Sequence, residues 1–142
     1  MNQPLVLLDT NTVSNLLHQR PGFESIVAAL DGREFGTVLI SSITLSELYT
    51  MADKAANPQN KHRALAAVLL RFPVPAFDEA AARHVGSIRA YLEPLGKRIG
   101  PMDTLIAAHA RSLDAVVVTD NVAEFSRVPG LRVENWFVRS PA

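Results

Sequence analysis

The sequence predicts an α/β fold in which a central parallel sheet has helices on both sides. Short, continuous apolar runs at 5–8, 37–40 and 115–118 are typical of strands that are buried on both faces. Longer segments with apolar residues at helical spacing separate these runs. Strands that alternate with helices favour parallel pairing, because a crossover helix returns the chain to the same end of the sheet.

Local signals place the boundaries of each expected element. Short polar side chains mark helix starts, since they accept hydrogen bonds from the free N–H groups of a first turn, and proline is tolerated there as well. In the first half of the chain we expect a strand at 5–8, a helix from a Thr10–Asn11 cap to before Pro21, a helix at 23–30, a strand at 37–40 and a helix capped by Ser42 or Thr44 that runs through Met51. A helix at 60–71 and a strand-like segment at 73–77 follow, and then a helix that Asp78 opens and that ends near Gly96. The last expected elements are a helix at 102–112 started by Pro101, a strand at 115–118 and a short strand at 131–134.

Length and composition limit the possible classes of protein. The 142 residues, 48% of them hydrophobic, suit one domain over 1–142 with a substantial core. We expect no transmembrane helix, because no apolar run approaches about 18 residues, and no signal peptide. The absence of cysteine excludes disulfides, thiolate catalysis and cysteine-ligated zinc, and fits a cytoplasmic protein. Fourteen basic residues balance fourteen acidic ones, so the net charge gives no overall attraction to nucleic acid.

Four acidic residues stand where an expected strand or helix begins or ends: Asp9, Glu47, Asp103 and Asp120. Side chains at the carboxyl ends of parallel strands converge on one edge of the sheet, where active sites of α/β domains form. Four carboxylates meeting there repel one another unless they are protonated or a cation neutralises them. Hard cations such as Mg²⁺ prefer such oxygen ligands. The pattern therefore predicts a metal-dependent enzyme.

Each of these acids also has an ordinary structural explanation. Asp9 suits a helix N-cap, Glu47 a solvated helix face, and Asp103 a first helical turn, where the helix dipole favours an acid. Asp120, followed by Asn121, suits a turn that leaves the sheet. Four unrelated caps explain the joint placement less well than one shared site does.

Other kinds of catalytic site have less support. The four histidines have no ligand-like mutual spacing. His109, two turns beyond Asp103, could flank the site, but we expect it to lie on an ordinary helix surface. The chain lacks the Gly-x-Ser-x-Gly elbow of serine hydrolases, the phosphate-binding Gly-x-x-x-x-Gly-Lys-[Ser/Thr] loop and the dinucleotide-binding Gly-x-Gly-x-x-Gly loop.

Four motifs, spread nearly from end to end, carry a resemblance to a known family. They are Leu7-Leu8-Asp9-Thr10-Asn11, then Ser41 to Leu48 around Glu47, then Gly100-Pro101-Met102-Asp103 to Ala110, and Val118-Thr119-Asp120-Asn121 to Leu131, which is followed by Glu134-Asn135-Trp136. In order and spacing they resemble the acidic motifs of PIN-domain ribonucleases and, among these, of the VapC-type toxins of bacterial toxin–antitoxin pairs.

The resemblance implies a PIN fold, usually dimeric, and endonucleolytic cleavage of RNA (tRNA, rRNA or mRNA) that depends on Mg²⁺, with Mn²⁺ as a possible substitute. It also implies a cognate VapB-type antitoxin that wraps the toxin and blocks its acidic pocket. We expect a homodimer. The apolar helices before Pro73 are candidates for the dimer interface, and equally for the core.

Residue roles follow from the resemblance together with the chemistry of phosphodiester hydrolysis. We expect Asp9 and Asp103 to be the primary metal ligands, with Glu47 and Asp120 completing the set directly or through waters. Neighbouring polar groups would hydrogen-bond to these ligands and orient them, and basic side chains at the rim would contact phosphates. The expected orienting groups are Thr10, Asn11, Thr119 and Asn121, and the candidate basic residues are Lys61, Arg63, Lys97 and Arg98.

Two alternatives stay open from the sequence. An aspartate-nucleophile phosphohydrolase also places an Asp after its first strand, but it needs a second Asp two residues later, where this chain has Asn11. A labile aspartyl-phosphate on Asp9 would support that class. The other alternative is a PIN-like module that binds RNA or protein without catalysis, and metal titration discriminates it from a nuclease because a scaffold needs no divalent-ion site.

Overall fold

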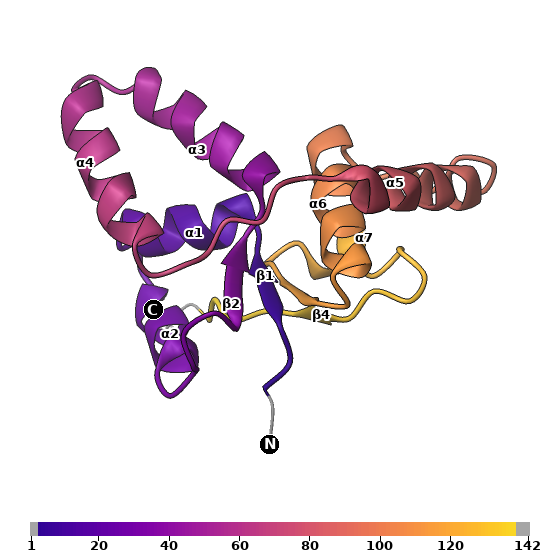
Figure 1. The fold of residues 1–142 in the computed structure, drawn as a ribbon, viewed down its shortest axis with the longest axis horizontal. Coiled ribbons are helices and arrows are strands. Elements are labelled where there is room, and N and C mark those ends of the chain that lie inside the picture. Colours follow the sequence, from indigo (N-terminus) through magenta and orange to yellow (C-terminus); the bar gives the residue numbers. More distant parts are fainter. Residues whose placement is uncertain (1–2, 139–142) are drawn as a thin grey trace.

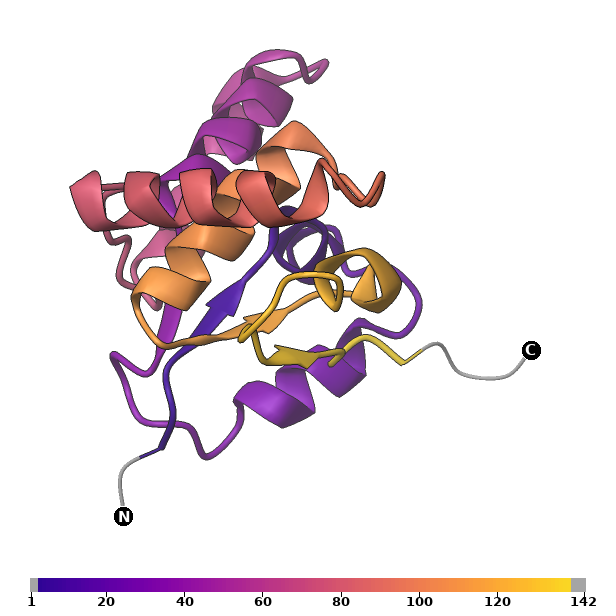
Figure 2. The same cartoon turned by 90° about the vertical axis from the view of Figure 1, so that its right-hand side faces the viewer.

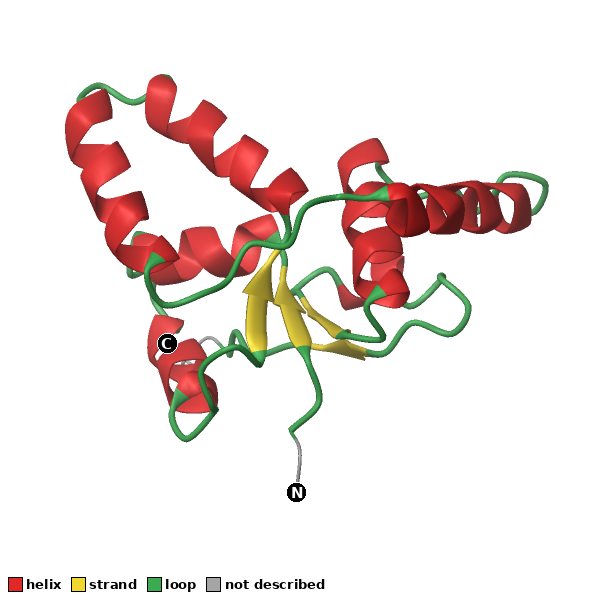
Figure 3. Cartoon of the chain, viewed as in Figure 1, coloured by secondary structure: helices red, strands yellow, loops and turns green. Residues whose placement is uncertain are grey.

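The computed structural model describes residues 3–138 and contains a four-stranded, fully parallel sheet (Figure 3). The strand order is β2-β1-β3-β4. The strands are β1 (Val6–Leu8), β2 (Val38–Ile40), β3 (Val116–Val118) and β4 (Val133–Glu134). The predicted α/β class with a central parallel sheet is therefore confirmed.

Helices cover both faces of this sheet, as Figures 1 and 2 show from two directions. No helix within residues 3–138 is long and apolar enough to cross a bilayer. In chain order the helices are α1 (Thr10–Leu17), α2 (Phe23–Leu30), α3 (Ser42–Asp53), α4 (Pro58–Leu69), α5 (Glu79–Leu92), α6 (Pro101–Ser112) and α7 (Val122–Phe125).

Two apolar cores lie on opposite faces of the sheet, because successive strand side chains point to opposite sides. Leu7 and Val117 face α5, α6 and α7, where they pack with residues such as Ile106. Leu8 and Val118 face the other side, whose core includes residues of α1, α3 and α4. All three residues of β1, β2 and β3 are buried, as the continuous apolar runs predict.

The strand register brings the carboxyl ends of three strands level with one another. Leu8 pairs with Ile40 on one side and with Val118 on the other. The residues that follow these strands therefore emerge at one edge. They are Asp9, Ser41 and Thr119.

The segment 73–77 is not a strand, contrary to our expectation. Its carbonyl groups still meet the edge of β2, where Pro73 O accepts from Ile40 N at 3.0 Å and Pro75 O accepts from Ser42 N at 3.2 Å. Proline has no N–H to donate to a ladder, so two prolines in alternate positions leave an extended segment without regular pairing.

Several element boundaries also differ from the prediction. Ser41 caps α3 in place of Ser42 or Thr44, since its Oγ accepts from Ile43 N at 3.0 Å. Helix α4 begins two residues early, with Pro58 in its first turn and Asn57 as its cap. The short helix α7 was not predicted, although Asn121 followed by Glu124 three residues later is the spacing of a capping box.

Candidate active site

Asp9 directly follows β1 and is the N-cap of α1. It is therefore both a helix cap and a residue of the candidate site. Its Oδ1 accepts a hydrogen bond from Thr12 N at 2.8 Å, and the side chain is only 3% exposed. Burial raises the pKa of Asp9, hydrogen bonds from Thr119 and Thr12 lower it, and the charge of Asp120 raises it further. One carboxylate is thus held at the start of a helix, next to the carboxyl end of β3.

Glu47 reaches the same place from α3. The helix starts directly after β2, which places the carboxylate opposite Asp9 and α1. The hydroxyl of Thr10 donates a short hydrogen bond to Glu47 Oε1. Thr10 is therefore one of the predicted orienting groups, and the carboxylate that it orients is Glu47.

Asp103 occupies the first turn of α6 and is half-buried. Burial raises its pKa, and the charges of Asp9, Glu124 and Glu47 raise it further, to about 6; a hydrogen bond from Asn121 opposes these effects. An ordinary aspartate has a value of 3.8. The ionised group is therefore destabilised mainly by lost hydration and then by neighbouring carboxylates.

The fourth predicted acid is placed differently from the other three. Asp120 is exposed and does not line the cleft that the others share, although its charge acts on Asp9. The residues on either side of it point to the site instead. Thr119 is fully buried and hydrogen-bonds to Asp9, while Asn121 hydrogen-bonds to Asp103.

Glu124 is a site residue to which sequence reasoning assigned no role. Its Oε1 accepts from Gly100 N at 2.6 Å and its Oε2 accepts from Asn121 Nδ2 at 2.7 Å. These hydrogen bonds lower the pKa of Glu124 and keep it ionised. Gly100 precedes α6, so Glu124 ties α7 to the start of the helix that carries Asp103. The capping-box spacing to Asn121 was the available signal.

The predicted residues Asp9, Glu47 and Asp103 line one cleft of about 310 Å³. A cation would relieve the repulsion that raises the pKa of Asp103, and the acidic donors are all oxygen, as Mg²⁺ and Mn²⁺ prefer. As the side chains lie, however, no three acidic, histidine or cysteine side chains within residues 3–138 form a ready-made metal-binding group. The remaining lining residues are Thr10, Asn11, Gly100, Pro101 and Met102.

The prediction for His109 was wrong. Its side chain is 1% exposed, and its Nδ1 lies 2.7 Å from Ser41 Oγ. The α6 surface on which it lies is covered by the start of α3 and by the segment before α5, where the Phe77 ring contacts the imidazole edge-on at 5.4 Å. Helical spacing identified the face, but not what packs on it.

The four candidate basic residues divide into two groups. Lys97 and Arg98 are exposed and immediately precede the Gly100–Pro101 wall of the cleft. Lys61 instead lines a separate cavity with residues of α1 and α3, and Arg63 is exposed on α4. None of the four lines the acidic cleft, and Arg98 lines an apolar cavity, so the phosphate contacts stay a prediction.

The chain is similar to proteins of a known family. The PIN domain family model matches residues 6–131. The chain is 39% identical over 130 residues to the tRNA(fMet)-specific endonuclease VapC of Shigella flexneri, covering 92% of this chain and 96% of that protein. It is 38% identical over 130 residues, with the same coverage, to ribonuclease VapC2 of Haemophilus influenzae.

Solved structures give the same relationship in three dimensions. The crystal structure of DNA-bound VapBC from Salmonella typhimurium superposes with a TM-score of 0.87 at 39% identity, covering 94% of this chain and 99% of that one. VapBC2 from Rickettsia felis, bound to a promoter DNA fragment, gives a TM-score of 0.84 at 32% identity, with 93% and 98% covered. The chain therefore belongs to the PIN-domain family and, within it, to the VapC ribonucleases.

Proposed function

We propose that this protein is a metal-dependent endoribonuclease that acts as the toxin of a VapBC-type toxin–antitoxin pair. The observation that carries the proposal is the shared cleft, in which Asp9, Glu47 and Asp103 come from three different elements. Relatives of similar length named as VapC ribonucleases support the choice of RNA as substrate. Because one such relative is named for tRNA(fMet), tRNA is the first substrate class to test.

Asp9, Asp103 and Glu47 would hold the metal. A bound Mg²⁺ or Mn²⁺ supplies an activated water and neutralises charge at the phosphate. Asp9 uses Oδ1 to cap α1, so its other oxygen is the one assigned to the cleft. Asp120 and Glu124 add negative charge at the edge of the site. Glu47, oriented by Thr10, is assigned to accept the proton of the attacking water.

The direct test is RNA cleavage by the protein stripped of any partner, with Mg²⁺, with Mn²⁺ and with EDTA. Discrete products that require metal and vanish in Asp9→Asn and Asp103→Asn are expected. Asp114→Asn is a matched control, since Asp114 follows the far end of α6, and asparagine tolerates its φ of 53°. Retained cleavage in both site variants would remove the basis of the proposal. A phosphate covalently attached to Asp9 would instead favour the phosphohydrolase class.

We further propose a VapB-type antitoxin as the partner, because the solved structures named above are VapBC complexes. Both proteins would act in the cytoplasm, where RNA is available. Co-expression with a cognate VapB-type antitoxin should restore growth that the toxin alone arrests. Growth arrest by the Asp9→Asn variant would show that the toxicity does not come from this cleft.

A homodimer formed through α5 and α6 has support from the exposed surface of these helices. Gly86 lies in the middle of α5, where glycine costs about 0.5–1 kcal/mol relative to alanine, and among residues 3–138 no neighbouring atom lies within 4 Å of the position of its missing Cβ. Ala82 and Ala90, one turn away on either side, are also exposed. Small residues in a row allow a second helix to approach closely, so a partner copy explains them.

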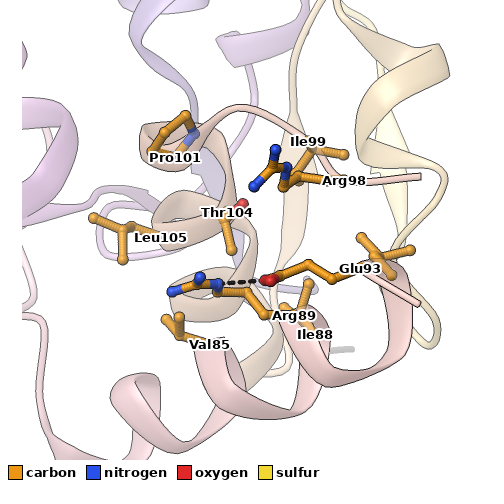
Figure 4. Close-up of a pocket in the computed structure, with 10 residues that line it drawn as sticks. Val85, Ile88, Arg89, Glu93, Arg98, Ile99, Pro101, Thr104 and Leu105 are labelled. Carbon is orange, nitrogen blue, oxygen red and sulfur yellow. Dashed lines mark hydrogen bonds and ion pairs between the residues drawn. The ribbon is translucent and has the colours of Figure 1, made fainter. Parts of the chain in front are cut away.

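Beside this row, an apolar cavity of about 260 Å³ opens between α5 and α6 (Figure 4). Its walls include Val85, Ile88 and Leu105, and the Arg89–Glu93 ion pair lies at its edge. Pro101 lines both this cavity and the acidic cleft. A dimer through this surface would place the two active sites near each other.

Sedimentation equilibrium tests the dimer with two substitutions at one position. Gly86→Ala should leave the dimer intact and raise the melting temperature, because alanine favours the helix. Gly86→Tyr should produce folded monomers, since its ring would occupy the approach of the second helix. A wild-type protein that sediments as a monomer at all concentrations would contradict this interface.

A further inference from the structure

The buried His109 lies at a junction between the elements that carry two of the active-site carboxylates. It is on α6, six residues after Asp103, and its Nδ1 contacts Ser41 Oγ, which caps α3, the helix of Glu47. The pair is separated by 68 residues in sequence and is enclosed on both sides, at 1% exposure for His109 and 0% for Ser41.

The two hydrogen-bonding contacts at this junction are both satisfied by a neutral imidazole. Ser41 Oγ accepts from Ile43 N, so its single O–H is free to donate to Nδ1. The backbone of Ala76 hydrogen-bonds the ring as well, and a carbonyl can only accept. A neutral imidazole satisfies both contacts, with Nδ1 accepting from Ser41 and the ring N–H donating to the Ala76 carbonyl.

Only a side chain that both accepts and donates a hydrogen bond meets these two requirements. A leucine would fill the space but leave the buried Ser41 O–H without an acceptor and would remove the ring N–H from the Ala76 carbonyl. Glutamine, in contrast, offers a carbonyl oxygen to Ser41 and an N–H to Ala76. Leucine and glutamine at position 109 therefore separate the effect of the lost hydrogen bonds from the effect of side-chain volume.

We propose that His109 is a positioning residue that sets the separation of the Asp103 and Glu47 carboxylates by joining α6 to the start of α3 through Ser41. This inference rests on the proposed function, because it concerns how the same cleft binds its metal. Phe77 extends the junction toward α5, since its ring packs on His109 and its N–H donates to Ser42 Oγ at 3.0 Å. Helices α3, α5 and α6 are thus held in fixed positions relative to one another behind the acidic cleft.

Mn²⁺ binding, measured by calorimetry on the metal-free protein, tests the inference apart from cleavage. His109→Leu should weaken Mn²⁺ binding about tenfold or more, as is typical when a group that orients metal ligands is lost. The kcat for RNA cleavage should fall with it, while KM stays within about twofold. His109→Gln should retain most of the affinity. Ile26→Ala, in the α2 core away from the cleft, controls for a general loss of stability.

Ser41→Ala provides an independent route if His109→Leu does not fold. It should also weaken Mn²⁺ binding, and adding His109→Leu to it should have little further effect, because both remove one connection. Mn²⁺ affinity unchanged in Ser41→Ala, or weakened equally in Ile26→Ala, would overturn the inference. A wild-type protein that neither binds Mn²⁺ nor cleaves RNA would overturn the proposed function itself, which is a distinguishable result.

Discussion

The two ends of the sheet are built from different kinds of residue. At the carboxyl end, β1, β2 and β3 are each followed by a polar side chain with almost no exposure: Asp9 at 3%, Ser41 at 0% and Thr119 at 0%. At the amino end the polar groups are at the surface, where Gln3 Nε2 donates to Gly32 O and Thr37 Oγ1 donates to Glu34 O.

The buried polar residues at the carboxyl end of the sheet maintain the site, whereas the surface polar residues at the amino end maintain only the fold. A buried polar group costs free energy unless it is hydrogen-bonded, so it persists only where its partners are also present. At the carboxyl end the partners are other site residues, since Thr119 hydrogen-bonds to Asp9 and Ser41 to His109. At the amino end, Gln3 and Thr37 make their hydrogen bonds at the surface, where water can replace them.

The largest effect expected is on cleavage at the carboxyl end. Asp103→Asn should reduce the single-turnover cleavage rate by about a hundredfold or more, since it removes a charged group from the reacting centre. Asp114→Asn, beyond the opposite end of α6, should leave the rate unchanged. Equal rates for the two variants would show that the half-buried position of Asp103 has no catalytic significance.

A matched pair of threonine substitutions compares the two ends directly. Thr119→Val should lower the free energy of unfolding by about 1–3 kcal/mol, because it leaves Asp9 and the N–H of Asn121 short of a buried partner. It should also slow cleavage. Thr37→Val at the amino end should cost less than about 1 kcal/mol and leave cleavage intact. Chemical denaturation measures the free energy of unfolding of both variants, and similar losses of stability would contradict the distinction between the two ends of the sheet.

The pH dependence of stability should also report on the carboxyl end. The pKa of Asp103 is raised from 3.8 to about 6, so folding favours its protonated form. The stabilisation that this preference gives is complete at pH values below the pKa of Asp103 in the unfolded chain, and it is lost as the pH rises through about 6. Metal-free wild type should therefore lose stability relative to Asp103→Asn over that window. Added Mn²⁺ should reverse the trend, since it binds the ionised group.

The smallest effect is expected at Gln3. Gln3→Ala removes the hydrogen bonds to Gly32 and to the N–H of Glu34, both exposed, and should change the free energy of unfolding by no more than about 0.5 kcal/mol. Cleavage and Mn²⁺ binding should be unchanged. A large loss of stability would mean that the amino end is held by more than its apolar core, and would weaken the comparison.

Much of the fold could be predicted because its signals are local. A continuous apolar run such as Val116–Val118 identifies a buried strand, and a polar residue before helical spacing identifies a cap, as Asp78 does for α5. The prediction failed where two local signals conflicted. In 73–77 the apolar residues favoured a strand, while the prolines removed the N–H groups that a strand needs.

The site was less predictable than the fold. Three of the four acids that the sequence singled out line one cleft, but Asp120 does not, and Glu124 holds the start of α6 instead. A strand end brings a residue to the edge of the sheet without determining which way its side chain turns. That direction depends on partners such as Gly100, 24 residues away from Glu124.

The sequence by itself determined the class of fold, the order along the chain of the four strands and of α1 to α6, and the candidate acids, because sterics, capping and apolar periodicity act over a few residues. Only the tertiary structure decided which strands lie side by side, which carboxylates share the cleft, and that His109 is buried against Ser41. These outcomes depend on packing between segments that are far apart in the chain, since burial and the electrostatic interactions of a side chain are set by the neighbours that the fold brings to it.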